Sequence, residues 1–347
     1  MGFAKAFNYG KNLPLSIGIS RGIGILWLVT FLLFTVAGVA LLFKACWWLW
    51  IGIAAALLSM VLIITIWNDA KFGSIANIII LVVVLLTITS LRFEKKFTND
   101  VVQNLERTQM LKSENICETD LLTLPEPVQR YMRYAGVVNK PKVKNFRVVF
   151  EGEMRSKSKD WFPFTTVQYN FFDEPTRLFF MKGKMFGLSL PGYHRYINAT
   201  ASMDISVFGL FSVVNETGPV LAKTETVTLF NDMCLLAPAT LNDKRIQWKP
   251  IDRNSVVATF TNHGISVSAI LYFNEKGQLI NFLSNDRTDI STMKSYPFTT
   301  PVYEYKNVIN RNIAASADAV YDYPDGKFVY GKFRLKEIEY NVHEFKK

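Results

Sequence analysis

Histidine is scarce in this chain, and the familiar catalytic signatures are missing from its sequence. The three histidines are His194, His263 and His343, and none stands with a carboxylate and a nucleophile at the spacing of a known catalytic family. The sequence contains no G-x-S-x-G nucleophile motif, no H-E-x-x-H zinc motif and no phosphate-binding loop of Walker type. It therefore predicts no cofactor and no metal ion, and it identifies no catalytic residue.

The segment Lys223–Ala237 places two polar residues within an otherwise apolar helix. An apolar stripe that includes Phe230 and Cys234 recurs at helical spacing, and Asn231 and Asp232 interrupt it. A helix that is apolar on most of its sides is buried, and an unpaired carboxylate there is costly. Asp232 therefore needs a cationic partner. The two polar residues would then form a structural ion pair that joins helix to sheet, an anchor for the headgroup of a bound amphiphile, or a catalytic centre. The candidate partners are Arg195, Arg253 and Arg287.

Aromatic residues crowd the stretch between positions 162 and 196. They are Phe162, Phe164, Tyr169, Phe171, Phe172, Phe179, Phe180, Phe186, Tyr193 and Tyr196. They form either the core of a sheet or the lining of a lipid-sized cavity, because an open sheet with one helix leaves part of its concave face unfilled. The candidate ligand-binding residues are Phe230, Asn231, Asp232, Arg195, Tyr196 and Arg287.

The elements that must position these residues are mostly β-strands. Apolar and polar residues alternate from Phe146 to Arg155, which is the period of a strand with one buried face. Turn signals such as Asn274–Gly277 and Pro324–Gly326 separate further runs of this kind. These runs are Phe164–Phe172, Arg177–Phe186, His194–Val207, Arg245–Ile251, Ser255–Thr261, Ser266–Phe273, Gln278–Ser284, Val302–Val308, Ala319–Tyr323 and Phe328–Asn341. The pattern predicts a mainly antiparallel α+β domain, a curved sheet or open half-barrel with one central helix.

A short amphipathic helix is expected ahead of the first strand. Thr123 and Glu126 have the spacing of a capping box, in which the hydroxyl and the carboxylate each accept from a helix-end N–H. Val128 and Tyr131 belong to the apolar stripe that follows, and Gly136 is expected to end the helix.

Three charge-free apolar blocks occupy the amino-terminal part of the chain. They cover about residues 22–43, 47–67 and 74–91, and a helix needs roughly 20 residues to cross a bilayer. The expected organisation is a membrane anchor of three transmembrane helices over 1–96, a helical connector over 97–122 and a β-rich soluble domain over 123–347. We therefore expect an integral, multi-pass membrane protein.

Charge gives little information about orientation and argues against nucleic acid. The net charge is +10, and the residues before Phe97 contribute +6, so most of the basicity flanks the apolar blocks. No basic run resembles a nucleic-acid patch, so the sequence predicts no nucleic-acid partner. With three spans, four cationic residues fall on each side of the membrane, which leaves the orientation undecided.

The cysteines carry no recognisable motif. Cys46 lies at the boundary of an apolar block, while Cys117 and Cys234 are either a disulfide pair or free thiols. The oligomeric state is equally open.

Four segments resemble a family of bacterial proteins of unknown function, DUF6544. They are LPEPVQRYMRYAGV (124–137), WFPFTTVQYNFF (161–172), ETVTLFNDMCLLAPATL (225–241) and ILYFNEKGQLINFLSNDR (270–287). The resemblance covers roughly residues 120–345 and implies a bacterial inner (cell) membrane, with no established activity, substrate or catalytic residue. The expected strands and single buried helix are also similar to the half-barrel of periplasmic lipoprotein carriers.

These features favour one function and leave two others open. We expect a membrane-anchored domain that binds a lipid, lipoprotein or other amphiphile at the membrane surface. Because a carrier fold of this kind is commonly needed outside the cytoplasm, we expect the soluble domain there. The alternatives are a membrane-anchored enzyme with a polar site near Asp232, and a structural or sensory interaction domain.

Overall fold

The computed structural model describes residues 2–9, 18–112, 114–157, 159–185, 188–207 and 209–346. Its contacts divide the chain into two compact units, Met1–Leu91 and Arg92–Lys347. Phe186, which belongs to the expected aromatic group and ends one expected strand, lies outside the described residues.

The first unit is helical. Its helices are α1 (Gly2–Ala6), α2 (Arg21–Leu42), α3 (Trp48–Thr65), α4 (Trp67–Ala70) and the first part of α5 (Gly73–Gln109). Among the described residues, three helices are long and apolar enough to cross a membrane, namely α2, α3 and α5. They confirm the three expected apolar helices, with ends that differ by one or two residues for the first two.

Small residues on α3 allow close helix packing within this unit. Gly52, Ala55 and Ala56 are buried, as is usual where the backbones of apolar helices approach each other. The buried Asn77 side chain on α5 donates a hydrogen bond to Ser59 Oγ on α3 over 3.0 Å, so a polar pair also links two of the apolar helices.

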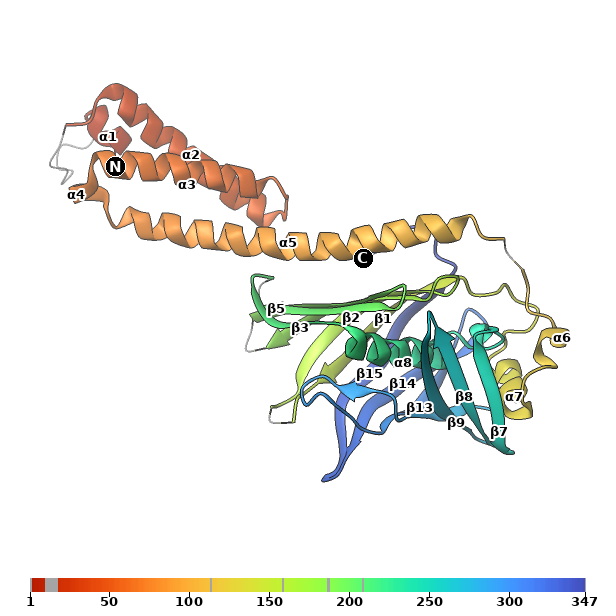
Figure 1. The fold of residues 1–347 in the computed structure, drawn as a ribbon. Coiled ribbons are helices and arrows are strands. Elements are labelled where there is room, and N and C mark those ends of the chain that lie inside the picture. The colour runs from red at the N-terminus through yellow and green to blue at the C-terminus, as the bar shows by residue number, and fades with distance from the viewer. Residues whose placement is uncertain are drawn as a thin grey trace. The chain divides into compact units, whose positions relative to one another are not determined.

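The second unit contains a large antiparallel sheet, shown in Figure 1. Its strands are β1 (Asn145–Met154), β2 (Phe162–Phe171), β3 (Thr176–Met185), β4 (Leu188–Ile197), β5 (Thr200–Val207), β6 (Phe211–Thr217), β7 (Ile246–Asp252), β8 (Ser255–Asn262), β9 (Ile265–Phe273), β10 (Leu279–Ser284), β13 (Phe298–Val308), β14 (Arg311–Tyr323) and β15 (Gly326–Tyr340). Within the described residues the sheet has 13 strands in the order β6-β5-β4-β3-β2-β1-β15-β14-β13-β10-β9-β8-β7. The short strands β11 (Thr288–Asp289) and β12 (Lys294–Ser295) form a separate pair. The expected open, curved antiparallel sheet is confirmed.

One expected strand is a hairpin. The run His194–Val207 is interrupted at Asn198 and Ala199, which adopt φ angles of 50° and 58° and connect β4 to β5. Two consecutive residues with positive φ are typical of the tight turns that join antiparallel strands. The sequence prediction also missed β6, because its residues lack a clear alternation of apolar and polar side chains.

The single long helix of this unit, α8 (Pro219–Leu236), lies within the curve of the sheet (Figure 1). It begins four residues before the expected Lys223 and contacts strands from both halves of the sheet, including β5 and β9. Phe230 on α8 is fully buried, and its ring lies 5.4 Å from that of Phe260 and 5.8 Å from that of Phe282. The η1 turn (Pro238–Thr240) follows, because Pro238 cannot continue the helix.

The part of α5 that belongs to the second unit packs against the outer face of the sheet. Phe97, Val101 and Leu105 are buried there in one cluster with Tyr169 and Tyr193. Helix α5 ends at Gln109, and the chain then continues in an irregular conformation towards α6 (Glu118–Leu121).

The predicted capping box at Thr123 is wrong. Helix α7 (Glu126–Tyr134) begins two residues later than this box predicts, with Pro125 in place of Thr123 at the N-cap position and in an extended conformation. A start at Thr123 would require Leu124 to be helical, and the α conformation is disfavoured for a residue that precedes a proline. The expected end of the helix is confirmed, because Gly136 follows it with a φ of 66°.

We expect Phe230→Ala to lower the free energy of unfolding of the second unit by about 3–5 kcal/mol, because it leaves a cavity among three packed aromatic rings. Urea unfolding of a chain that begins at Arg92 measures this loss. Val213→Ala, on the exposed edge strand β6, is the control and should change stability by less than about 0.5 kcal/mol. Equal losses in the two variants would contradict the packing described for α8.

Candidate functional site

A cavity of about 360 Å³ lies between α8 and the concave face of the sheet, here called the concave cavity. Its walls are mostly apolar and include Phe150, Phe179, Phe298, Phe328 and Leu235. Ser156, Lys157, Ser291 and Thr292 line it and are exposed, so they mark its opening. The volume lies in the range of about 300–1,000 Å³ that is usual for small-molecule sites.

A set of buried and half-buried polar residues, the Arg177 cluster, borders the cavity. It consists of Gln168, Asn170, Arg177, His194, Glu225 and Asp232. Arg177 Nε donates to Asp232 Oδ2 over 2.8 Å, and its Nη1 donates to Glu225 Oε2 over 3.1 Å. The side chains of Arg177 and Glu225 are only 7% and 2% exposed, so one guanidinium serves two carboxylates away from water.

Side-chain amides complete the bonding of Asp232. Gln168 Nε2 and Asn170 Nδ2 donate to Asp232 Oδ2 over 2.7 and 3.0 Å, and Gln168 Oε1 accepts from Arg177 Nη2 over 3.2 Å. A buried carboxylate that is both paired with a cation and hydrogen-bonded avoids the cost of an isolated charge.

Strand and helix periodicity bring these residues together. On β2, Gln168 and Asn170 face the concave side, while Tyr169 between them lies in the cluster under α5. On β3, Arg177 is paired with Asn170 across the ladder. On α8, Glu225 and Asp232 are seven residues apart, which is about two helical turns and places both on one face.

Glu225 remains ionised despite its burial. Burial by itself raises the pKa of this carboxyl group, but the contact with His194 and the charge of Arg177 outweigh it and lower the pKa to about 2. His194 Nδ1 lies 3.4 Å from Glu225 Oε1, and its ring packs edge-on against Phe179.

A second cation, Arg287, lines the cavity within an aromatic cage. Its guanidinium lies 4.3 Å from the ring centre of Phe298, and Nη1 donates to the hydroxyl groups of Tyr321 and Tyr330. Burial alone lowers the pKa of Arg287. The phenols of Tyr321 and Tyr330 and the Glu225 carboxylate raise it by more than this, so the net shift is upwards and the side chain stays charged.

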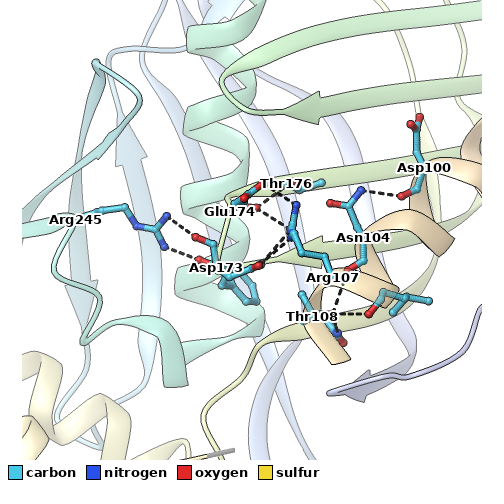
Figure 2. Close-up of polar contacts among 11 residues, drawn as sticks. Asp100, Asn104, Arg107, Thr108, Asp173, Glu174, Thr176 and Arg245 are labelled. Atoms are coloured by element: carbon cyan, nitrogen blue, oxygen red, sulfur yellow. Dashed lines mark hydrogen bonds and ion pairs between the residues drawn. The ribbon is translucent and has the colours of Figure 1, made fainter. Parts of the chain in front are cut away.

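The β2–β3 turn that precedes Arg177 is fixed from two sides (Figure 2). Arg107 on α5 donates from Nε and Nη2 to the Asp173 carboxylate over 2.9 and 3.0 Å, and from Nη1 to Glu174 Oε2 over 2.9 Å. Arg245 donates to the backbone oxygens of Phe172 and Asp173. Because Arg177 follows this turn directly, the contacts hold the start of β3 in place.

The structure brings three of the six expected ligand-binding residues to the cavity. Asn231, Asp232 and Arg287 line it, and Asn231 Nδ2 donates to Thr300 Oγ1 over 3.0 Å. Phe230 lies on the opposite side of α8, in the aromatic core.

The other two expected residues lie on β4 but away from the cavity. Tyr196 is buried between α8 and β8, where its hydroxyl contacts Thr226 and Asn262. Arg195 points to the outer face and pairs with Asp100 of α5 over 2.9 Å. The alternation of side chains along a strand explains why Arg195 and its neighbour His194 face opposite sides.

The expected cationic partner of Asp232 is present, but it is Arg177 rather than Arg195, Arg253 or Arg287. Sequence reasoning also missed Glu225 and His194. The seven-residue spacing between Glu225 and Asp232 could have indicated Glu225, and the alternation that places Arg177 on the same face as Phe179 could have indicated Arg177.

The three cysteines are free, with Cys117 exposed and Cys234 buried in α8, so the alternative of free thiols is the observed one. Within the described ranges, no group of three or more histidine, cysteine or carboxylate side chains has the arrangement of a metal site.

Comparison with known proteins places the β-rich part of the chain in one family. The model of the family of unknown function DUF6544 matches residues 114–333. No curated protein matches the chain. A LolA superfamily protein from Nitrosomonas europaea has 9% sequence identity and a TM-score of 0.36, with 61% of this chain and 93% of that chain covered. A beta-barrel-like protein of the domain of unknown function DUF1849 from Brucella abortus has 10% identity and a TM-score of 0.19, with 57% and 98% covered.

The low pKa of Glu225 predicts a pH dependence of stability. Because the pKa falls from its ordinary 4.5 to about 2 on folding, the ionised group stabilises the fold fully above pH 4.5, and this contribution disappears as the pH falls towards 2. We expect Glu225→Gln to remove about 3 kcal/mol at pH 7 and little at pH 2. Urea unfolding across this range tests it, with the exposed Glu304 changed to Gln as control. A constant difference at all pH values would contradict the assignment.

Proposed function

Because the chain belongs to DUF6544, a family of unknown function, we propose a function from the geometry of the site: a membrane-anchored protein that binds a single-chain lipid or similar amphiphile in the concave cavity. The observation that carries this proposal is the cavity itself, which is apolar along its walls and polar at the Arg177 cluster and Arg287. A site of this character suits a molecule with a long apolar part and a compact polar end.

The arrangement of α8 supports a cavity that is part of the fold. The apolar side of α8 that bears Phe230 fills the space against β8 and β10. Its other side presents Leu235 and Leu236 to the cavity together with Glu225, Thr228, Asn231 and Asp232, and the two carboxylates are hydrogen-bonded to Arg177 instead of filling the remaining concave space. The empty volume next to them therefore follows from the residue types on the two sides of one helix.

We further propose that α2, α3 and α5 cross a bacterial inner membrane and that the β-rich domain lies outside the cytoplasm. The length and apolar composition of these helices support the crossing. A binding site for an amphiphile supports the outer side, because molecules that leave the membrane there must be shielded from water.

A second candidate function is favoured by one observation, the pairing of His194 with Glu225 beside Arg177 in the cavity wall. A histidine that is oriented by a carboxylate can act as a general base, so the site has the elements of acid–base catalysis. The two candidates differ in the fate of the ligand, which a binding protein returns unchanged and an enzyme returns as a product.

Filling the cavity should abolish binding. Ala317 lines the cavity, so we expect Ala317→Trp to occupy the space of the ligand and to reduce cross-linking of a photoreactive fatty acid by about tenfold or more. The measurement uses the full chain in nanodiscs of a neutral lipid, with mass spectrometry of the labelled peptides and of the recovered lipid. Glu304→Trp adds the same side chain at an exposed position of β13 and should leave the labelling unchanged. Equal labelling of Ala317→Trp and wild type would refute the cavity as the binding site.

The native Cys117 tests the proposed side of the membrane. It is an exposed free thiol, so in a Cys46→Ser variant we expect a membrane-impermeant maleimide to label it in intact spheroplasts of a bacterial host. Cys117→Ser should remove the label, since Cys234 is buried. Labelling that appears only after the membrane is permeabilised would place the domain in the cytoplasm.

A further inference from the structure

Arg287 is a charged residue of the cavity wall with unused hydrogen-bond donors. Its Nη1 serves the hydroxyl groups of Tyr321 and Tyr330, and its flat face rests on Phe298. In the part of the chain that the structure describes, Nε is buried and has no hydrogen-bond partner, and no carboxylate lies within ion-pair distance of the guanidinium. Burial of a cation in apolar surroundings is unfavourable unless it is paired.

The acidic residues near Arg287 are already engaged elsewhere. Glu225 bonds to Arg177 and His194, and it acts on Arg287 only over a longer range. Asp289 accepts hydrogen bonds from the backbone and hydroxyl groups of Ser291 and from the hydroxyl groups of Thr292 and Tyr323, at distances between 2.7 and 3.0 Å. The protein therefore supplies Arg287 with aromatic contacts and hydroxyl acceptors but with no counter-ion in contact.

Two other cations at the cavity differ from Arg287, because Arg155 Nε donates to the backbone oxygen of Val329 over 2.9 Å and Lys157 has a carboxylate partner. Arg155 lies between the rings of Trp161 and Phe328, at 4.5 and 4.8 Å from their centres. Lys157 at the opening pairs with Asp325 over 2.9 Å. Among the described cations that line the cavity, Arg287 is the one with a buried N–H group that has no hydrogen-bond partner.

We infer that the ligand of the concave cavity carries an anionic oxygen headgroup, a carboxylate or a phosphate monoester on a single apolar chain, which pairs with Arg287. The inference rests on the proposed function and specifies its ligand class. Nε and Nη2 form the edge of a guanidinium that binds two oxygens of one anion side by side, and this is the edge that Tyr321 and Tyr330 leave free. The apolar chain then follows the wall formed by Phe179, Phe298 and Phe328.

The test compares headgroups on one chain length. Photoreactive analogues of hexadecanoic acid, hexadecyl phosphate, hexadecanol and hexadecylamine are cross-linked to the full chain in phosphatidylcholine nanodiscs, and labelled cavity peptides are quantified. We expect the acid or the phosphate to exceed the alcohol by about tenfold or more, as a charge-assisted hydrogen bond implies, and the amine to label least. The anion that labels the cavity peptides more strongly shows whether the natural headgroup is a carboxylate or a phosphate.

Three variants test whether the preference for an anionic headgroup depends on Arg287. Arg287→Gln should reduce the anion to the level of the alcohol, and Arg287→Lys should retain part of the preference because it keeps the charge. Arg253→Gln, at an exposed position outside the cavity, should retain all of it. If Arg287→Gln does not fold, the wild-type preference and its partial retention in Arg287→Lys decide the matter.

Several outcomes would overturn the inference. Equal labelling by acid, phosphate and alcohol in the wild type would show a cavity that ignores the headgroup. Loss of the preference in Arg155→Gln, with retention in Arg287→Gln, would place the anion at the opening instead. Both results leave the binding cavity intact, whereas labelling of cavity peptides by none of the four probes would contradict the proposed function itself.

Discussion

The buried guanidinium of Arg177 joins the central helix to the sheet, and the shape of the site depends on this contact. It holds Asp232 and Glu225 of α8 on one side and extends from β3 on the other. Replacement by an apolar residue would leave Asp232 without a cationic partner and Glu225 with His194 alone, and the removal of one partner from a buried ion pair is strongly destabilising. The polar side of α8 therefore faces the concave space, and the cavity exists next to it.

The strands that carry this cluster serve two interfaces at once. Along β2 and β4, every second side chain faces α8, and the intervening ones meet α5 on the outer face. Gln168 and Tyr169 are neighbours in sequence, yet the first bonds to Asp232 and the second packs with Phe97. Consequently, a shift of one residue in the register of these strands would turn the polar residues of the cavity to the outer face. The aromatic residues that pack under α5 would then face the cavity.

Periodicity in the sequence was sufficient to predict the elements but not all of their contacts. The apolar helices, the central helix and most strands follow from patterns that depend only on neighbouring residues. The partner of Asp232 could not be predicted in this way, because several arginines were equally plausible. The pairing of β2 with β3 is what brings Arg177 next to Asn170. The helix start at Thr123 failed because the effect of a proline on the preceding residue outweighed a favourable capping pattern. The hairpin at Asn198 and Ala199 was missed because its turn contains no glycine.

The sheet is open, since β6 and β7 form its two ends and do not pair with each other in the described part of the chain. A closed barrel can widen only if backbone hydrogen bonds stretch or break, whereas an open sheet can bend at its free edges with its ladder intact. What resists such bending here is α8, because it contacts strands on both sides of the gap, including β5 and β9. Side-chain packing along one helix therefore connects the two ends of this sheet, where a closed barrel would use backbone hydrogen bonds between its first and last strands.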